Sequence, residues 1–133
     1  MEYVCLVYTE ESAFESMSQS EKDALDDASL ANDHELADSG HLILAQALEP
    51  VDTAVTIRVR DGKMSATDGP FAETKEQLGG LVLVEATDLN DAIRIAGNLP
   101  IARLGSIEVR PAVDLDKKVR ERPEQTPTNG GAA

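Results

Sequence analysis

The sequence has a single cysteine and no long apolar run, and it begins without the marks of a leader peptide. One cysteine, Cys5, excludes a disulfide within the chain and agrees with a reducing cytosol. No stretch approaches the roughly 18 consecutive apolar residues of a membrane span. The first residues, Met-Glu-Tyr-Val, lack the basic start and apolar core of a signal peptide. These shortages predict a cytoplasmic protein with no membrane contact.

Basic residues are also scarce, with 12 Lys and Arg against 25 Asp and Glu, which gives a formal net charge of −13. A field of that sign repels phosphate backbones, so nucleic-acid binding is disfavoured. The same charge also serves simple solubility. His34, His41 and Cys5 match no metal-ligand spacing. We therefore expect no metal and no cofactor.

Two unbroken apolar runs, residues 3–8 and 81–84, are typical of strands covered on both faces. Residues 41–48 and 106–110 predict two further strands. Between them, residues 55–67 alternate in polarity around Asp-Gly, which predicts a hairpin with a two-residue turn.

The first long helix is expected over residues 21–39, with Ser20 as its N-cap and Gly40 ending it. Its apolar stripe is thin and consists of Ala24, Leu25, Ala28, Ala31 and Leu36. Such a helix must take its stability from packing.

The second helix is expected to begin after Asp88, its N-cap, with Asp91 at the third helical position, and to stop at residues 97–100. Its stripe has the spacing of one helical face and consists of Leu89, Ala92, Ile93 and Ala96.

The order of these elements predicts an α+β, ferredoxin-like βαββαβ fold with an inserted β-hairpin. Right-handed crossovers place both helices on one face of the sheet, with the two apolar strands central. Residues 1–112 form this domain, and residues 113–133 read as a polar, flexible tail.

Two helices cover only one face, so the other face of the central strands lacks cover in a monomer. Leaving four large side chains exposed forgoes about 6–12 kcal/mol at roughly 1.5–3 kcal/mol each. That equals a typical domain stability of about 5–15 kcal/mol. We therefore expect a homodimer packed sheet to sheet, a dimeric α/β barrel.

Residues 68–80, Asp-Gly-Pro-Phe-Ala-Glu-Thr-Lys-Glu-Gln-Leu-Gly-Gly, are explained by neither periodicity nor ordinary turns. Asp-Gly-Pro predicts a turn, and the spacing of Thr74 and Gln77 predicts one short helical turn. Phe71 is one of only two phenylalanines, so a solvent-facing role for it is unexpected. Gly79 and Gly80 let the backbone bend or approach another chain closely.

Together with Gly-Ser-Ile-Glu-Val-Arg-Pro at residues 105–111, this motif resembles the DGPF branch of the YCII-related proteins, over residues 2–112. The resemblance implies a ferredoxin-like subunit, a homodimer, a bacterial cytosolic setting and a genetic link to extracytoplasmic-function sigma factors. It implies no settled reaction. Other YCII relatives are proposed to use a histidine early in the first helix with an aspartate; here His34 comes a turn or more later.

Three residues are candidate catalytic groups. Asp68 is either a general base screened by Phe71 or a turn aspartate that bonds nearby amides. His41 follows a helix end, where it either shuttles protons or caps and is solvated. Lys75, with Glu73 and Glu76, either holds a small polar ligand or belongs to a solvated turn.

Candidate ligand-binding residues are Phe71, Glu73, Arg58, Gly79 and Gly80. The glycine pair can present amides to an anion, although no Lys-Ser/Thr of a P-loop follows. Arg58 lies on the polar face of its strand, where it either pairs across an interface or contacts a ligand.

Two functions remain open. The first is a homodimer that binds a small molecule or a protein partner, including a sigma factor. The second is a cofactor-free enzyme with Asp68 as base, assisted by His41 or Lys75, acting on a small polar or carbonyl substrate. No Gly-x-Ser-x-Gly or Cys/His arrangement indicates a nucleophile.

Overall fold

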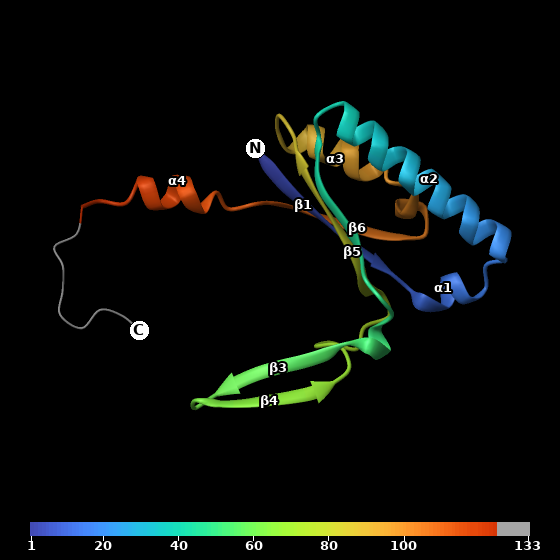
Figure 1. Ribbon diagram of the computed structural model, residues 1–133, viewed down its shortest axis with the longest axis horizontal. Coiled ribbons are helices and arrows are strands. Elements are labelled where there is room, and N and C mark those ends of the chain that lie inside the picture. Colours follow the sequence, from blue (N-terminus) through green and yellow to red (C-terminus); the bar gives the residue numbers. More distant parts are fainter. Residues whose placement is uncertain (125–133) are drawn as a thin grey trace.

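The computed structural model describes residues 1–124 as an α+β fold with one main sheet and a separate hairpin (Figure 1). Four antiparallel strands form the main sheet in the order β2-β5-β1-β6. Their bounds are β1 Glu2–Thr9, β2 Leu42–Ala47, β5 Gln77–Glu85 and β6 Gly105–Pro111. The predicted βαββαβ order is confirmed, and the two strands built from unbroken apolar runs, β1 and β5, are central.

Two helices cover one face of this sheet, α2 (Gln19–Asp38) and α3 (Leu89–Gly97), as predicted (Figure 1). The shorter elements are α1 (Glu11–Glu15), α4 (Leu115–Arg120) and the 3-10 turns η1 (Val51–Thr53) and η2 (Pro100–Arg103). The sequence analysis did not predict α4, and residues 125–133 of the expected tail lie outside the described residues. None of the helices described is long and apolar enough to cross a membrane.

Strands β3 (Val55–Arg60) and β4 (Lys63–Asp68) form the predicted hairpin. Asp61 and Gly62 both have positive φ, 52° and 74°, as the primed two-residue turn requires. The hairpin projects away from the main sheet (Figure 1). Its apolar side chains, Val55, Ile57, Val59 and Met64, are exposed in a single chain.

Helix α2 begins one residue after Ser18, so the prediction of Ser20 as N-cap was wrong. The Ser18 hydroxyl accepts from the Glu21 amide, and the Glu21 carboxylate accepts from the Ser18 amide. These two reciprocal bonds form a capping box, which needs a Glu or Gln side chain at the third helical position to reach back to the N-cap amide. At the other end, Gly40 has φ 80° and His41 N–H donates to Leu36 O at 2.8 Å, a Schellman motif that confirms Gly40 as the terminator.

The inner face of α2 differs from the predicted stripe. Ala24, Ala28 and Ala31 are exposed, and the face turned toward the sheet carries Leu25, Ser29, Asn32 and Leu36. Alanine favours a helix whether or not it is buried, so alanines at helical spacing do not show which face of the helix is buried. The predicted stripe was misplaced for this reason. The inner face is therefore half polar.

Helix α3 has the predicted N-cap, since Asp88 accepts from the Asp91 amide at 2.9 Å. Its buried face is formed by Ala92, Ile95 and Ala96, whereas Leu89 and Ile93 of the predicted stripe are about half exposed. Ile95 is 1% exposed and is the largest residue at the centre of the core.

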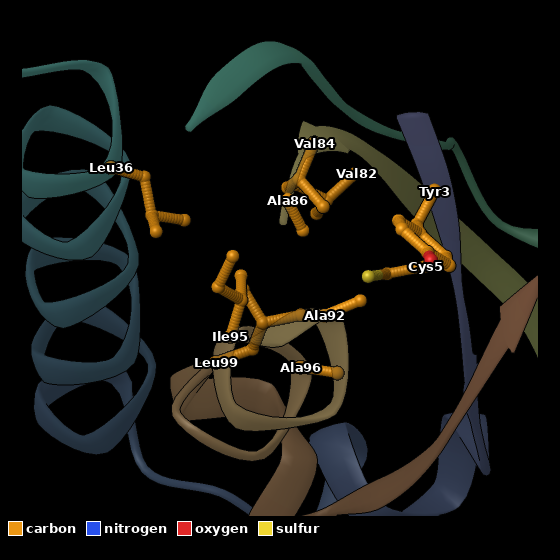
Figure 2. Packing of buried hydrophobic residues seen from close by; sticks show 10 residues of the cluster. All are labelled: Tyr3, Cys5, Leu36, Val82, Val84, Ala86, Ala92, Ile95, Ala96 and Leu99. Atoms are coloured by element: carbon orange, nitrogen blue, oxygen red, sulfur yellow. The ribbon is translucent and has the colours of Figure 1, made fainter. Parts of the chain in front are cut away.

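The core lies between the helices and the covered face of the sheet (Figure 2). Tyr3, Cys5, Val82 and Val84 from β1 and β5 face Leu36 and the apolar side of α3. Burial raises the pKa of the Cys5 thiol, which suits a packing residue and not a reactive one.

The opposite face of the sheet carries the alternate residues of the same strands. Val4, Leu6 and Tyr8 of β1 are only partly buried, as are Leu81 and Leu83 of β5. The neighbouring positions on β6 are polar, with Glu108 beside Leu6 in the register. One chain therefore leaves an apolar face without a helix on it.

Strand β5 begins at Gln77, four residues before the predicted run, and the predicted helical turn at Thr74–Gln77 is absent. The Gln77 side chain instead donates to the carbonyl oxygens of Ala72 and Thr74, both at 3.0 Å. Gly80 lies in β5 itself, where an added Cβ would be 2.9 Å from Gln46 O of β2. The glycine pair thus permits close pairing within the sheet.

Candidate functional site

A cavity with a volume of about 750 Å³ lies between α2 and the sheet. Its floor is formed by Val7 and Thr9 of β1 and by Ala45, Gly80 and Val82 of the neighbouring strands. Helices α1 and α2, the segment through η1, and η2 supply its other walls.

The cavity exists because the side chains on both of its walls are too small to fill the space between α2 and the sheet. Above, α2 presents Leu25, Ser29 and Asn32, of which only Leu25 is a large apolar residue. Below, the strands offer small residues such as Ala45 and Gly80. The helix and the sheet close on each other only near Leu36, where α2 joins the core. The space between them is left open toward the N-terminal end of α2.

Six carboxylate residues line the cavity, and no Lys, Arg or His is among its described lining. They come from three segments: Glu11, Glu15, Asp26, Asp33, Glu49 and Asp52. Desolvation raises the pKa of the Asp33 carboxyl group, and the charge of His34 opposes that shift. The Glu11 carboxylate accepts from the Val51 amide at 2.8 Å, which ties α1 to η1 across the mouth of the cavity.

Two lining residues carry buried polar groups. Thr9 is 5% exposed. The Asn32 Nδ2 is buried and has no hydrogen-bond partner within residues 1–124. A buried donor without a partner costs free energy, and Asn32 lies between this cavity and a second hollow that it also lines.

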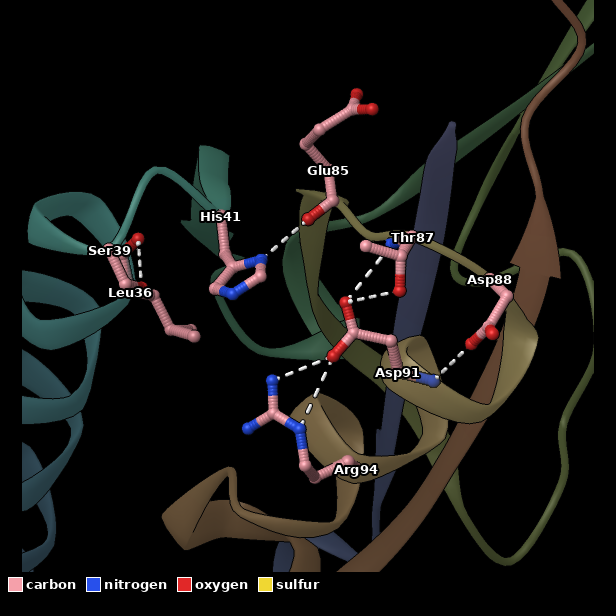
Figure 3. Close-up of polar contacts among 8 residues, drawn as sticks. All are labelled: Leu36, Ser39, His41, Glu85, Thr87, Asp88, Asp91 and Arg94. Atoms are coloured by element: carbon pink, nitrogen blue, oxygen red, sulfur yellow. Dashed lines mark hydrogen bonds and ion pairs between the residues drawn. The ribbon is translucent and has the colours of Figure 1, made fainter.

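A smaller polar hollow of about 470 Å³ surrounds His41, Arg94 and Asn98 at the C-terminal end of α2. His41 Nδ1 donates to Glu85 O at 2.8 Å, since a carbonyl oxygen only accepts (Figure 3). Asp91 accepts from the Thr87 amide at 3.0 Å and from Arg94 at 2.7 Å. The bond from Thr87, followed by Arg94, lowers the pKa of the Asp91 carboxyl group.

Comparison with known proteins gives the family. Residues 1–116 match the YCII-related domain. The chain belongs to the YCII-related family. An uncharacterized protein of Rhizobium meliloti (strain 1021) is 36% identical over 113 residues, which is 84% of this chain and 91% of that protein.

In this YCII-related chain the residues of the 68–80 motif lie at the base of the hairpin. Gly69, with φ 105°, makes the predicted turn, and its amide donates to Ala54 O at 2.8 Å. Asp68 is exposed, and its carboxylate accepts none of the hydrogen bonds found in the described residues. Phe71 is 78% exposed, with the Arg58 guanidinium 5.4 Å above its ring. Glu73 and Lys75 lie exposed in the same loop.

The three candidate catalytic residues do not meet within one YCII-related subunit. Asp68 and Lys75 precede β5, whereas His41 pairs with Glu85 at its far end. The nine residues of β5 span about 25 Å at about 3.3 Å each. Of the predicted site residues, Gly79 and Gly80 line the large cavity, and His41 lines the polar hollow.

The sequence analysis missed the acidic and polar lining of the cavity, including Thr9, Asn32 and Asp33. One signal was present: Leu25, Ser29, Asn32 and Leu36 recur at the spacing of a helical face, with polar residues in its middle. In the described residues, no group of three or more His, Cys, Asp or Glu side chains is arranged to hold a metal ion.

Proposed function

We propose that this YCII-related protein is a homodimer that binds a small molecule in the cavity between α2 and the sheet. The carrying observation is the cavity itself. Its volume of about 750 Å³ falls within the range of about 300–1,000 Å³ typical of small-molecule sites. Its lining combines apolar walls with a few buried polar groups, which is the usual composition of such sites.

The dimer is supported by the apolar sheet face opposite the helices. Val4, Leu6, Leu81 and Leu83 lie there without a covering element in one chain. A second copy packed on this face would bury them and leave the cavity, on the helix side, open to ligands. Placement in the DGPF branch rests on the Asp-Gly-Pro-Phe turn at residues 68–71.

A cavity-filling pair of variants tests the binding site. Ser29→Phe places a ring in the cavity from α2, whereas Ala28→Phe places the same ring on the exposed side of that helix. We expect a neutral apolar fluorescent probe to bind the parent and Ala28→Phe alike, and Ser29→Phe about tenfold or more weakly. Circular dichroism checks that both variants fold. Equal binding to all three proteins would place the site elsewhere.

An enzyme with Asp68 as general base is the second candidate. Its support is the exposed Asp68 carboxylate, which lies in the same turn segment as the exposed Phe71; a second subunit packed there would shield both from water. A screen of small polar and carbonyl metabolites tests for turnover. If Asp68→Asn abolishes a turnover found in the parent while fold and dimer persist, the enzyme reading holds. If Asp68→Asn only lowers stability, Asp68 serves the turn.

A further inference from the structure

The charge on the cavity lining is of one sign. Its carboxylates come from α1, from α2 and from the segment around η1, so they are not the product of one acidic run. Arg58, Lys75 and Arg94, the basic residues near other candidate features, are not among the lining residues. A negative potential concentrated over apolar walls favours a positively charged ligand.

The interior of the cavity is apolar. Val7, Val82 and Leu99 belong to the lining and are also among the buried residues of the fold. A small hydrated metal ion gains nothing from such walls, whereas an organic body does. The ligand that suits both features is therefore an amphipathic one, with an apolar body inside and a cationic group near the carboxylates.

Two neighbouring residues of α2 carry a burial cost at the cavity. The buried Asn32 Nδ2 has no partner in the described part of the chain and lies on the cavity lining. Asp33, its neighbour on α2, carries a desolvated carboxyl group. A ligand cation beside Asp33 would offset the desolvation of its carboxylate, whereas the Asn32 amide, a donor, does not distinguish an amine from other ligands.

We propose that the cavity selects organic amines that carry a protonated nitrogen on an apolar body. The amine nitrogen lies toward the carboxylates of the lining, and the body lies over Val82 and beneath Leu25. This inference rests on the proposed function, since it names the ligand class of the same site.

Three probes of one shape test the selection: 4-phenylbutylamine, 4-phenylbutanol and 4-phenylbutyrate, titrated calorimetrically into the full chain. We expect the amine to bind about tenfold more tightly than the alcohol and the carboxylate to bind most weakly. Raising the salt concentration to about 0.5 M should weaken amine binding and leave alcohol binding unchanged.

Two adjacent carboxylates on α2 give a matched pair of variants. Both side chains are exposed, but Asp26 lines the cavity and Asp27 does not. Asp26→Asn should weaken amine binding several-fold with little effect on the alcohol, and Asp27→Asn should change neither. Equal loss in both variants would show attraction to the net charge of the protein and would overturn the inference.

The outcomes separate the inference from the proposed function. If the alcohol or the carboxylate binds as tightly as the amine, and Ser29→Phe abolishes that binding, the amine selection is wrong and the binding site stands. If none of the three probes binds and the neutral fluorescent probe does not bind either, the proposed function fails together with the inference.

Discussion

Asp33 shows how the cavity acts on a single residue. Desolvation raises the pKa of its carboxyl group. The folded protein then holds this proton more tightly than the unfolded chain, so stability is full below the unfolded pKa of about 3.9 and falls as the pH rises through the folded value. Asp33→Asn removes that loss. We expect the variant to melt at a higher temperature than the parent near pH 7 and at a similar temperature near pH 3.

Asp27→Asn is the control for this prediction, because Asp27 is exposed on the same helix. It should leave the melting temperature unchanged at both pH values. An Asp33→Asn variant less stable than the parent near neutral pH would show that the Asp33 carboxylate is stabilised in the fold and that the account of its environment is wrong.

Gly105 illustrates a second residue-scale constraint. A Cβ at this position would lie 2.1 Å from Tyr8 O, a backbone atom held in the pairing of β1 with β6. Gly105→Ala should therefore lower the free energy of unfolding by about 1–3 kcal/mol. Gly97→Ala, with nothing within 4 Å of its added Cβ, should be neutral or stabilising by up to about 1 kcal/mol. Urea denaturation measures both, and equal midpoints for Gly105→Ala and the parent would contradict the packing described.

At the scale of elements, the start of α2 is where the sequence prediction and the structure differ, because the N-cap is Ser18 and not Ser20. Ser18 forms a reciprocal capping box with Glu21, and Ser20 lies inside the helix. Ser18→Ala should cost about 1 kcal/mol of stability, and Ser20→Ala less than about 0.5 kcal/mol. The same denaturation measurement compares the two. A larger loss for Ser20→Ala would restore Ser20 as the cap.

The elements that could be predicted are those marked by a short, unambiguous pattern in the sequence. Apolar runs marked β1 and β5, Asp61-Gly62 marked the hairpin, and Gly40 marked the end of α2. The inner face of α2 could not be predicted, because its exposed alanines imitate an apolar stripe. The early start of β5 was hidden by Gly79-Gly80, which resemble a break. Gly80 instead packs closely against β2, and Gly79 packs against Thr9 of β1.

The candidate site was less predictable than the fold. A cavity arises from side chains that are too small to fill the space between two elements, and no single position in the sequence records that space. The motif at residues 68–80 drew attention because it is unusual, yet only its last four residues, Gln77 to Gly80, reach the cavity, and its turn residues do not. The role of Asp68, His41 and Lys75 stays a prediction, and only a second subunit can bring them nearer to one another.

At the scale of the whole molecule, the uncovered apolar face predicts the assembly. We expect light scattering to give twice the subunit mass of 14.2 kDa for the parent. Leu6→Glu places a charge at the centre of that face and should give a folded monomer, since a buried unpaired charge costs several kcal/mol at an interface. Leu30→Glu is the control: Leu30 lies on α2 and is 58% exposed, so this variant should remain dimeric. A monomeric parent would remove the sheet-to-sheet dimer.

The most direct test of the central claim is a crystal structure of the protein with the tightest-binding of the three phenylbutyl probes. The account predicts the phenyl ring between Leu25 and Val82 and the polar end of the probe toward the carboxylates of α1 and α2. Density for the probe on the uncovered sheet face or at the hairpin base, with the cavity beneath α2 closed by neighbouring side chains, would contradict it.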